Sequence, residues 1–187
     1  MNSKTAIVFL ADGFEECEGL LVIDLLRRAE VKVITASIMG RTQITSSHGI
    51  VLQADALAED VDYDSADMLI LPGGYHGTMK LAESSLVKRQ CRRASDSRKY
   101  IAAICAAPSV LAGIGLLEGK DATCHPSFED RMDGAVLTHA DVSEAGNIIT
   151  GRGLGAAIPF ALKLVEKLAD LETADRIAKA ICYENRP

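Results

Sequence analysis

Cys105 is the residue of this sequence best placed to act as a nucleophile. It stands between an apolar run at 100–104, which predicts a buried strand, and an apolar segment at 106–117, which predicts a helix. Its neighbours in AAICAAP (102–108) are small, which allows the backbone to reverse sharply. A cysteine on such a turn resembles the strained, exposed residue of a nucleophile elbow. The start of the following helix favours its thiolate, whereas a buried structural cysteine is the competing interpretation.

Two other predicted strands end in residues that suit chemistry. The strand at 5–11 is followed by the acidic segment DGFEECE (12–18), and the strand at 66–71 by Pro-Gly-Gly (72–74). In open α/β sheets, ligands bind outside the carboxyl ends of the strands. We therefore expect both segments to meet Cys105 along one crevice.

Glu18 is the carboxylate of interest in the first of these segments. It shares a helix face with Glu15 at a spacing of three residues. A carboxyl group held against a thiolate is expected to have a raised pKa and to donate a hydrogen bond. Taken from the residues alone, a solvated acid at a helix start is the favoured interpretation.

The glycine pair Gly73–Gly74 allows the backbone to turn with its N–H groups towards Cys105. Together with the amide of Ala106, such groups could form an oxyanion hole. A plain tight turn explains the pair of glycines equally well.

His125 follows a predicted strand at 122–124 and could serve as a base or proton shuttle to a cysteine. A polar residue at a strand end is the simpler interpretation, and His76 and His139 are weaker candidates. Cys124 and His125 do not predict a zinc site, because adjacent residues rarely bind one ion and the sequence has no C-x-x-C. No metal site is predicted.

The segment GRGLGA (151–156) matches the dinucleotide fingerprint loosely. Only helices are predicted after it, so no second βα unit with a ribose-binding acid remains. A tight turn is the better interpretation, and no cofactor is expected.

Strands alternate with helices along the whole chain, which predicts an α/β fold with a mainly parallel sheet covered by helices on both faces. One domain is expected over residues 1–187. Besides the strands above, the patterns predict a strand at 31–36, a hairpin between 41 and 55, short strands at 135–137 and 147–150, and helices at 15–29, 81–97, 154–171 and 174–183.

The composition is that of an ordinary globular protein, with 48% hydrophobic and 25% charged residues. The net charge of −6 argues against nucleic acid as a main partner, and basic residues at 88–93 predict a solvated helix face. Five cysteines at irregular spacings, with no signal peptide before the first strand, predict free thiols in the cytoplasm. The uncharged stretch at 101–117 is broken by Pro108 and two glycines, so no membrane span is expected.

Four motifs occur in order: GFEECE (13–18), LPGGYHG (71–77), AAICAAP (102–108) and THADV to TGRGLG (138–155). In this combination the sequence resembles the DJ-1/ThiJ/PfpI superfamily, and within it the branch of the Parkinson-disease protein and bacterial ThiJ-type relatives. The resemblance covers essentially the whole chain. It implies a flavodoxin-like three-layer sandwich that forms a homodimer and requires no cofactor or metal.

The resemblance also assigns roles to residues. It implies that Cys105 is the reactive cysteine, Glu18 its protonated glutamate and His125 the nearby histidine. The oxyanion amides fall on Gly74 and Ala106, with Gly73 in the same turn.

Three positions depart from family patterns. Peptidase-like members have a histidine where Ala106 stands, which weakens a peptidase interpretation. Ala107 replaces a glycine of many relatives, and Gln53 stands where some relatives have an interface cysteine.

The implied function is cysteine-dependent chemistry on reactive dicarbonyls, of the glyoxalase III type, or on glycated side chains as a deglycase. Cys105 would add to the aldehyde to form a hemithioacetal, and Glu18 or His125 would move the proton. The alternative is an oxidative-stress sensor or redox-regulated chaperone in which Cys105 is oxidised to a sulfinate. The sequence does not separate the two.

Overall fold

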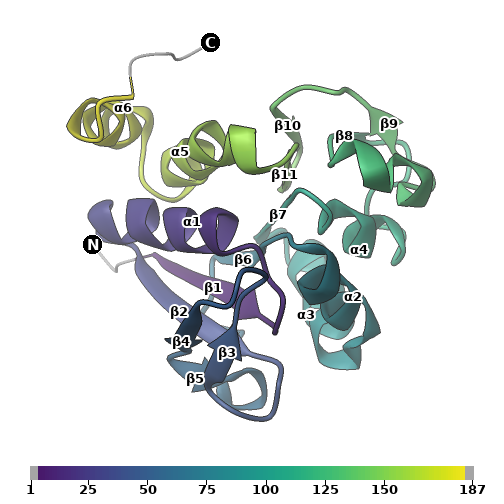
Figure 1. The fold of residues 1–187 in the computed structure, drawn as a ribbon. Coiled ribbons are helices and arrows are strands. Elements are labelled where there is room, and N and C mark those ends of the chain that lie inside the picture. The colour runs from purple at the N-terminus through teal and green to yellow at the C-terminus, as the bar shows by residue number, and fades with distance from the viewer. Residues whose placement is uncertain (1–3, 184–187) are drawn as a thin grey trace.

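A seven-stranded sheet lies at the centre of the computed structural model, which describes residues 4–183 (Figure 1). Its strands run in the spatial order β10-β11-β7-β6-β1-β2-β5. All neighbours are parallel except β10, which is antiparallel to β11. The bounds are β1 (Thr5–Leu10), β2 (Lys32–Ser37), β5 (Ala56–Leu57), β6 (Met68–Leu71), β7 (Tyr100–Ile104), β10 (Val142–Ala145) and β11 (Ile148–Gly151).

Helices cover both faces of this sheet (Figure 1). One face carries α1 (Glu16–Arg28), α5 (Ala157–Leu168) and α6 (Leu171–Ala180), and the other carries α2 (Tyr75–Glu83), α3 (Ser85–Asp96) and α4 (Pro108–Ala112). Alternate side chains of each strand point to opposite faces. Val8 accordingly joins the apolar cluster under α1 and α5, whereas Phe9 joins the cluster under α3 and α4. The flavodoxin-like three-layer architecture expected from the sequence is confirmed.

The order of the parallel strands places the crevice. The chain moves outward from β1 to β2, and then returns to the other side of β1 for β6, β7 and β11. Ligands bind where the order of an open α/β sheet reverses, outside the carboxyl ends of the strands. In this chain that point lies at the ends of β1 and β6, beside the end of β7.

The predicted helix over 81–97 is divided in the structure. α2 begins earlier and ends at Glu83, and α3 begins at Ser85. Ser84 between them is extended (φ −67°, ψ 112°), and its hydroxyl accepts a hydrogen bond from the N–H of Val87 at 3.3 Å. The break forms because this hydroxyl satisfies an N–H group that a new helix leaves without a partner.

Two other helix predictions were too long. In place of a helix over 106–117, only α4 forms, because Pro108 starts it and Gly115 at φ +78° turns the chain away. The predicted helix over 154–171 opens as a 3-10 turn (Leu154–Ala156), and α5 ends at Leu168. Asp170 then caps α6 by accepting from the N–H of Thr173 at 2.7 Å, so α6 starts earlier than the predicted residue 174.

The short strands were predicted in part. The hairpin between 41 and 55 is confirmed as antiparallel β3 (Gln43–Thr45) and β4 (Val51–Gln53). The segments predicted at 122–124 and 135–137 form β8 (Asp121–Ala122) and β9 (Val136–Leu137), which pair only with each other. The sequence reasoning missed the edge strands β5 and β10.

No helix within residues 4–183 is both long and apolar enough to span a membrane. The prediction of one domain over 1–187 includes residues 1–3 and 184–187, which lie outside the described residues.

Candidate active site

Cys105 follows the last residue of β7 and has the left-handed backbone conformation expected of an elbow, with φ +65°. This conformation is rare for residues other than glycine and costs of order 1 kcal/mol or more. Two backbone hydrogen bonds hold it. The N–H of Cys105 donates to the Gly151 carbonyl at 2.9 Å, and the Cys105 carbonyl accepts from the N–H of His125 at 2.8 Å. The predicted strained turn is therefore confirmed.

Glu18 lies in the first turn of α1 with only 1% of its surface exposed. One carboxylate oxygen, Oε2, accepts a hydrogen bond from the N–H of Gly73 at 3.1 Å, and the carboxyl group is hydrogen-bonded to Cys105. A Cβ atom at position 73 would lie 2.3 Å from that oxygen and 2.6 Å from Cys105 Cβ. Gly73 is therefore required for the two side chains to meet, and its amide orients Glu18 rather than adding to an oxyanion hole.

The pair has unusual protonation. Burial raises the pKa of Glu18 to about 7. Burial, together with the charge of the Glu18 carboxylate, raises the pKa of the Cys105 thiol to about 12, while the amides of Gly74 and Ala106 act to lower it. The amide of Ala106 at the helix start acts to favour the thiolate, as the sequence predicts, but burial and the charge of Glu18 have the larger effect on the pKa.

The two groups act as a unit that loses its first proton near pH 7. Above that pH the pair carries one proton and one negative charge. When the proton lies on Glu18, the charge that opposes the thiolate is gone, and the amides of Gly74 and Ala106 face the sulfur. The protonation of Glu18 therefore sets whether a negative charge opposes the Cys105 thiolate.

A cleft of about 480 Å³ opens onto this pair. Its walls come from the carboxyl ends of several strands and the turn before α5, as the topology requires. The lining residues are Glu15, Glu18, Gly74, Cys105, His125, Pro126, Asp141, Arg152, Gly153, Leu154, Gly155 and Ala156.

His125 lies at the exposed rim of this cleft. Its Nδ1 accepts from the backbone N–H of Ser127 at 3.2 Å and lies 2.8 Å from the Ser127 hydroxyl. Because a backbone N–H can only donate, the neutral imidazole carries its proton on Nε2. The two weaker histidine candidates have other neighbours: His139 pairs with Glu129 at 3.1 Å, and the ring of His76 packs edge-on against Tyr75.

The sequence reasoning did not identify Arg152 or Asp141 as residues of the cleft, whereas Glu15 belongs to a segment that was expected there. Arg152 belongs to the segment interpreted as a tight turn. Its backbone N–H donates to the Asp141 carbonyl at 2.9 Å, which fixes the turn beside the cleft. Two signals were available: Arg152 lies two residues after the strand predicted at 147–150, and both residues belong to the motif THADV to TGRGLG (138–155).

Comparisons with known proteins agree with this architecture. Residues 4–167 match the model of the DJ-1/PfpI family. "Protein dj-1beta" of Drosophila melanogaster is 39% identical over 181 residues, covering 96% of this chain and 97% of the relative. "Glutathione-independent glyoxalase DJR-1.2" of Caenorhabditis elegans is 31% identical over 182 residues, covering 96% of each. The solved structure "Toxoplasma gondii DJ-1, oxidized" has a TM-score of 0.94 and 34% identity, covering 98% of this chain and 100% of that one.

Proposed function

This chain belongs to the DJ-1/PfpI family, and we propose that it is a glutathione-independent glyoxalase that converts small dicarbonyls to 2-hydroxy acids through Cys105. The observation that carries the proposal is the hydrogen bond between the buried carboxyl group of Glu18 and the half-buried Cys105 at the floor of a cleft. A relative similar over almost the whole chain is named as a glutathione-independent glyoxalase.

The first step is addition of the Cys105 sulfur to the aldehyde carbon of the substrate. A C–S bond forms, and the carbonyl π electrons move to the oxygen, which takes the proton of Glu18. The amides of Gly74 and Ala106, which face the sulfur, stabilise the negative charge while it moves to that oxygen. The product is a hemithioacetal and a Glu18 carboxylate.

The second step moves hydrogen between the two carbons of the substrate. The Glu18 carboxylate removes the C–H proton of the hemithioacetal carbon, and the ketone oxygen takes a proton from Nε2 of His125, giving an enediol. Glu18 returns its proton to the second carbon while His125 recovers one from the first hydroxyl. A thioester of a 2-hydroxy acid results, and water releases the acid and the Cys105 sulfur. The net reaction adds one water to the dicarbonyl, so neither oxidant nor reductant is needed.

The same pair supports a second candidate function, an oxidative-stress sensor or redox-regulated chaperone. Cys105 is reachable through the cleft, and a protonated Glu18 can donate a hydrogen bond to an oxidised sulfur. A similar solved structure is titled as an oxidised DJ-1. We also propose that the protein acts as a deglycase on glycated side chains. The proposal further includes a homodimeric assembly and a cytoplasmic location.

The test is production of lactate from methylglyoxal by the purified protein with no glutathione added. We expect Cys105→Ser to lose at least about 100-fold in turnover, because serine is a far weaker nucleophile without an adjacent base. Cys182→Ser, which changes an exposed cysteine, serves as the control and should leave turnover unchanged. Unchanged turnover in Cys105→Ser would refute the glyoxalase proposal.

Peptide mapping after mild peroxide treatment tests the second candidate. Cys105 should be oxidised ahead of the other four cysteines. Prior oxidation of another cysteine would rule out the sensor role.

A further inference from the structure

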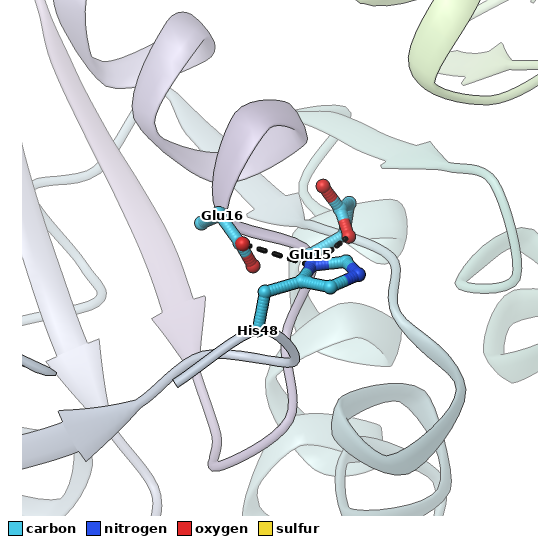
Figure 2. A group of neighbouring side chains, drawn as sticks. All are labelled: Glu15, Glu16 and His48. Atoms are coloured by element: carbon cyan, nitrogen blue, oxygen red, sulfur yellow. Dashed lines mark hydrogen bonds and ion pairs between the residues drawn. The ribbon is translucent and has the colours of Figure 1, made fainter. Parts of the chain in front are cut away.

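Three side chains of types that can bind metal ions converge beside the cleft, outside the reactive pair (Figure 2). Glu15 and Glu16 lie at the start of α1, and His48 lies in the turn between β3 and β4. Nδ1 of His48 is 2.8 Å from Oε1 of Glu16 and 3.5 Å from Oε2 of Glu15. Figure 2 shows the imidazole lying between the two carboxylates.

The spacing of these three atoms is close to that of the ligand atoms around a tetrahedrally coordinated ion. Nitrogen and oxygen ligands bind Zn²⁺ at about 2.0–2.2 Å, which places neighbouring ligand atoms about 3.4 Å apart. One ligand atom from each of the three residues lies within 4.8 Å of the others, and the two measured distances are 2.8 and 3.5 Å. Changes of at most about 1.4 Å in these distances would bring the three atoms to the spacing of ligands around one tetrahedral ion. His48 has room for such a shift, since its side chain is 72% exposed.

The charges at this point also favour a cation. The side chains of Glu16 and Glu15 are only 8% and 13% exposed. Among the ion pairs of residues 4–183, His48 is the only partner of either carboxylate. A buried carboxylate is costly unless a positive charge or hydrogen bonds compensate it. Here the two carboxylates share one imidazole as their ion-pair partner and one hydroxyl, that of Ser47, as a hydrogen-bond donor.

We propose that Glu15, Glu16 and His48 bind a divalent transition-metal ion of the zinc type. An imidazole with two carboxylates suits zinc, cobalt or nickel better than calcium or magnesium, which prefer oxygen ligands alone. Three protein ligands leave a fourth position for water. The hydroxyl of Ser47 lies 3.0 Å from a carboxylate oxygen of both Glu15 and Glu16, where it orients the ligands from outside the ion's first shell.

The site lies beside the cleft that opens onto the reactive pair, because Glu15 also lines that cleft. The binding site itself does not depend on the proposed activity.

The experiment is titration of the full chain with Co²⁺ followed by absorption spectroscopy, and with Zn²⁺ by calorimetry. We expect one ion per chain with a spectrum that lacks a thiolate-to-cobalt band. His48→Gln and Glu16→Gln should each weaken binding by at least about tenfold, as loss of a ligand requires. The matched control is His139→Gln, since His139 is also exposed but faces the single carboxylate of Glu129; it should bind as the natural protein does.

Three results would overturn the proposal. They are an absence of saturable binding, unchanged affinity in His48→Gln, and a thiolate band that assigns the ion to Cys17 or Cys105. Because Glu16 is buried, thermal unfolding of each variant checks that it folds. The exposed position of His48 makes its variant decisive in either case.

Discussion

Replacing Glu18 with glutamine removes a titrating group from the interior of the protein, and its effect on stability can be worked out from the structure. The pKa of this carboxyl group rises from an ordinary 4.5 to about 7 on folding, mainly because of burial. Between these values the folded protein keeps a proton that the unfolded chain has already released. The free energy of unfolding therefore falls as the pH rises from 4.5 to 7, and the stabilising effect of the protonated carboxyl is complete only below pH 4.5.

The size of the effect follows from the same values. Each tenfold change in proton affinity is about 1.4 kcal/mol, so the full loss is about 3 kcal/mol by pH 8. That is a large share of the 5–15 kcal/mol that stabilises a typical domain. Glutamine has almost the same shape and can still accept from Gly73, but it does not titrate. Relative to the natural protein, Glu18→Gln should gain about 3 kcal/mol of stability between pH 4 and pH 8.

The assay is urea unfolding of both proteins at several pH values between 4 and 8. Taking the difference between the two cancels carboxylates that titrate in both, such as Asp12 and Glu16, whose pKa values are lowered. Glu83→Gln, which changes an exposed glutamate, is the control. A difference between natural protein and Glu18→Gln that does not change with pH would refute the raised pKa of Glu18.

Two further substitutions test the packing around the site and the core. Gly73→Ala should lower the free energy of unfolding by about 2 kcal/mol and abolish turnover, because its Cβ would lie 2.3 Å from the Glu18 carboxylate. The control is Gly113→Ala, at a helix end with φ −60°, which should change the free energy of unfolding by less than about 1 kcal/mol. Equal effects of the two substitutions would contradict this prediction. Phe160→Ala should lower the free energy of unfolding in urea by about 3–5 kcal/mol, since the ring of Phe160 is fully buried between α5 and the sheet. A loss below about 1 kcal/mol would show that the core there is loosely packed.

The elbow could be predicted from the sequence because its cause is local. A buried strand, small neighbours and a following proline all lie within a few residues of Cys105. The central strands were predictable for a similar reason, since unbroken apolar runs suit strands that are buried on both faces. Edge strands such as β5 have two residues and carry no such pattern.

The rest of the site depends on contacts between distant segments. Helical spacing puts Glu15 and Glu18 on one face but does not predict which of them is buried. The carboxylate of Glu18 is the one that accepts a hydrogen bond inside the protein, from the amide of Gly73, which lies 55 residues away in the sequence. The pKa of Cys105 depends on distant segments as well, because burial and the charge of Glu18 outweigh the effect of the amides at the helix start. His48 reaches Glu16 only through the folded hairpin, 32 residues along the chain.

The central claim, that Glu18 and Cys105 share one proton, is tested most directly by the rate at which iodoacetamide alkylates Cys105 as a function of pH. Peptide mapping measures this rate beside that of the exposed Cys182 in the same sample. In the natural protein the Cys105 rate should rise through an inflection near pH 7, where the pair loses its first proton, and Glu18→Gln should lack that inflection. A Cys105 profile that follows Cys182, or one that is unchanged in Glu18→Gln, would contradict the claim.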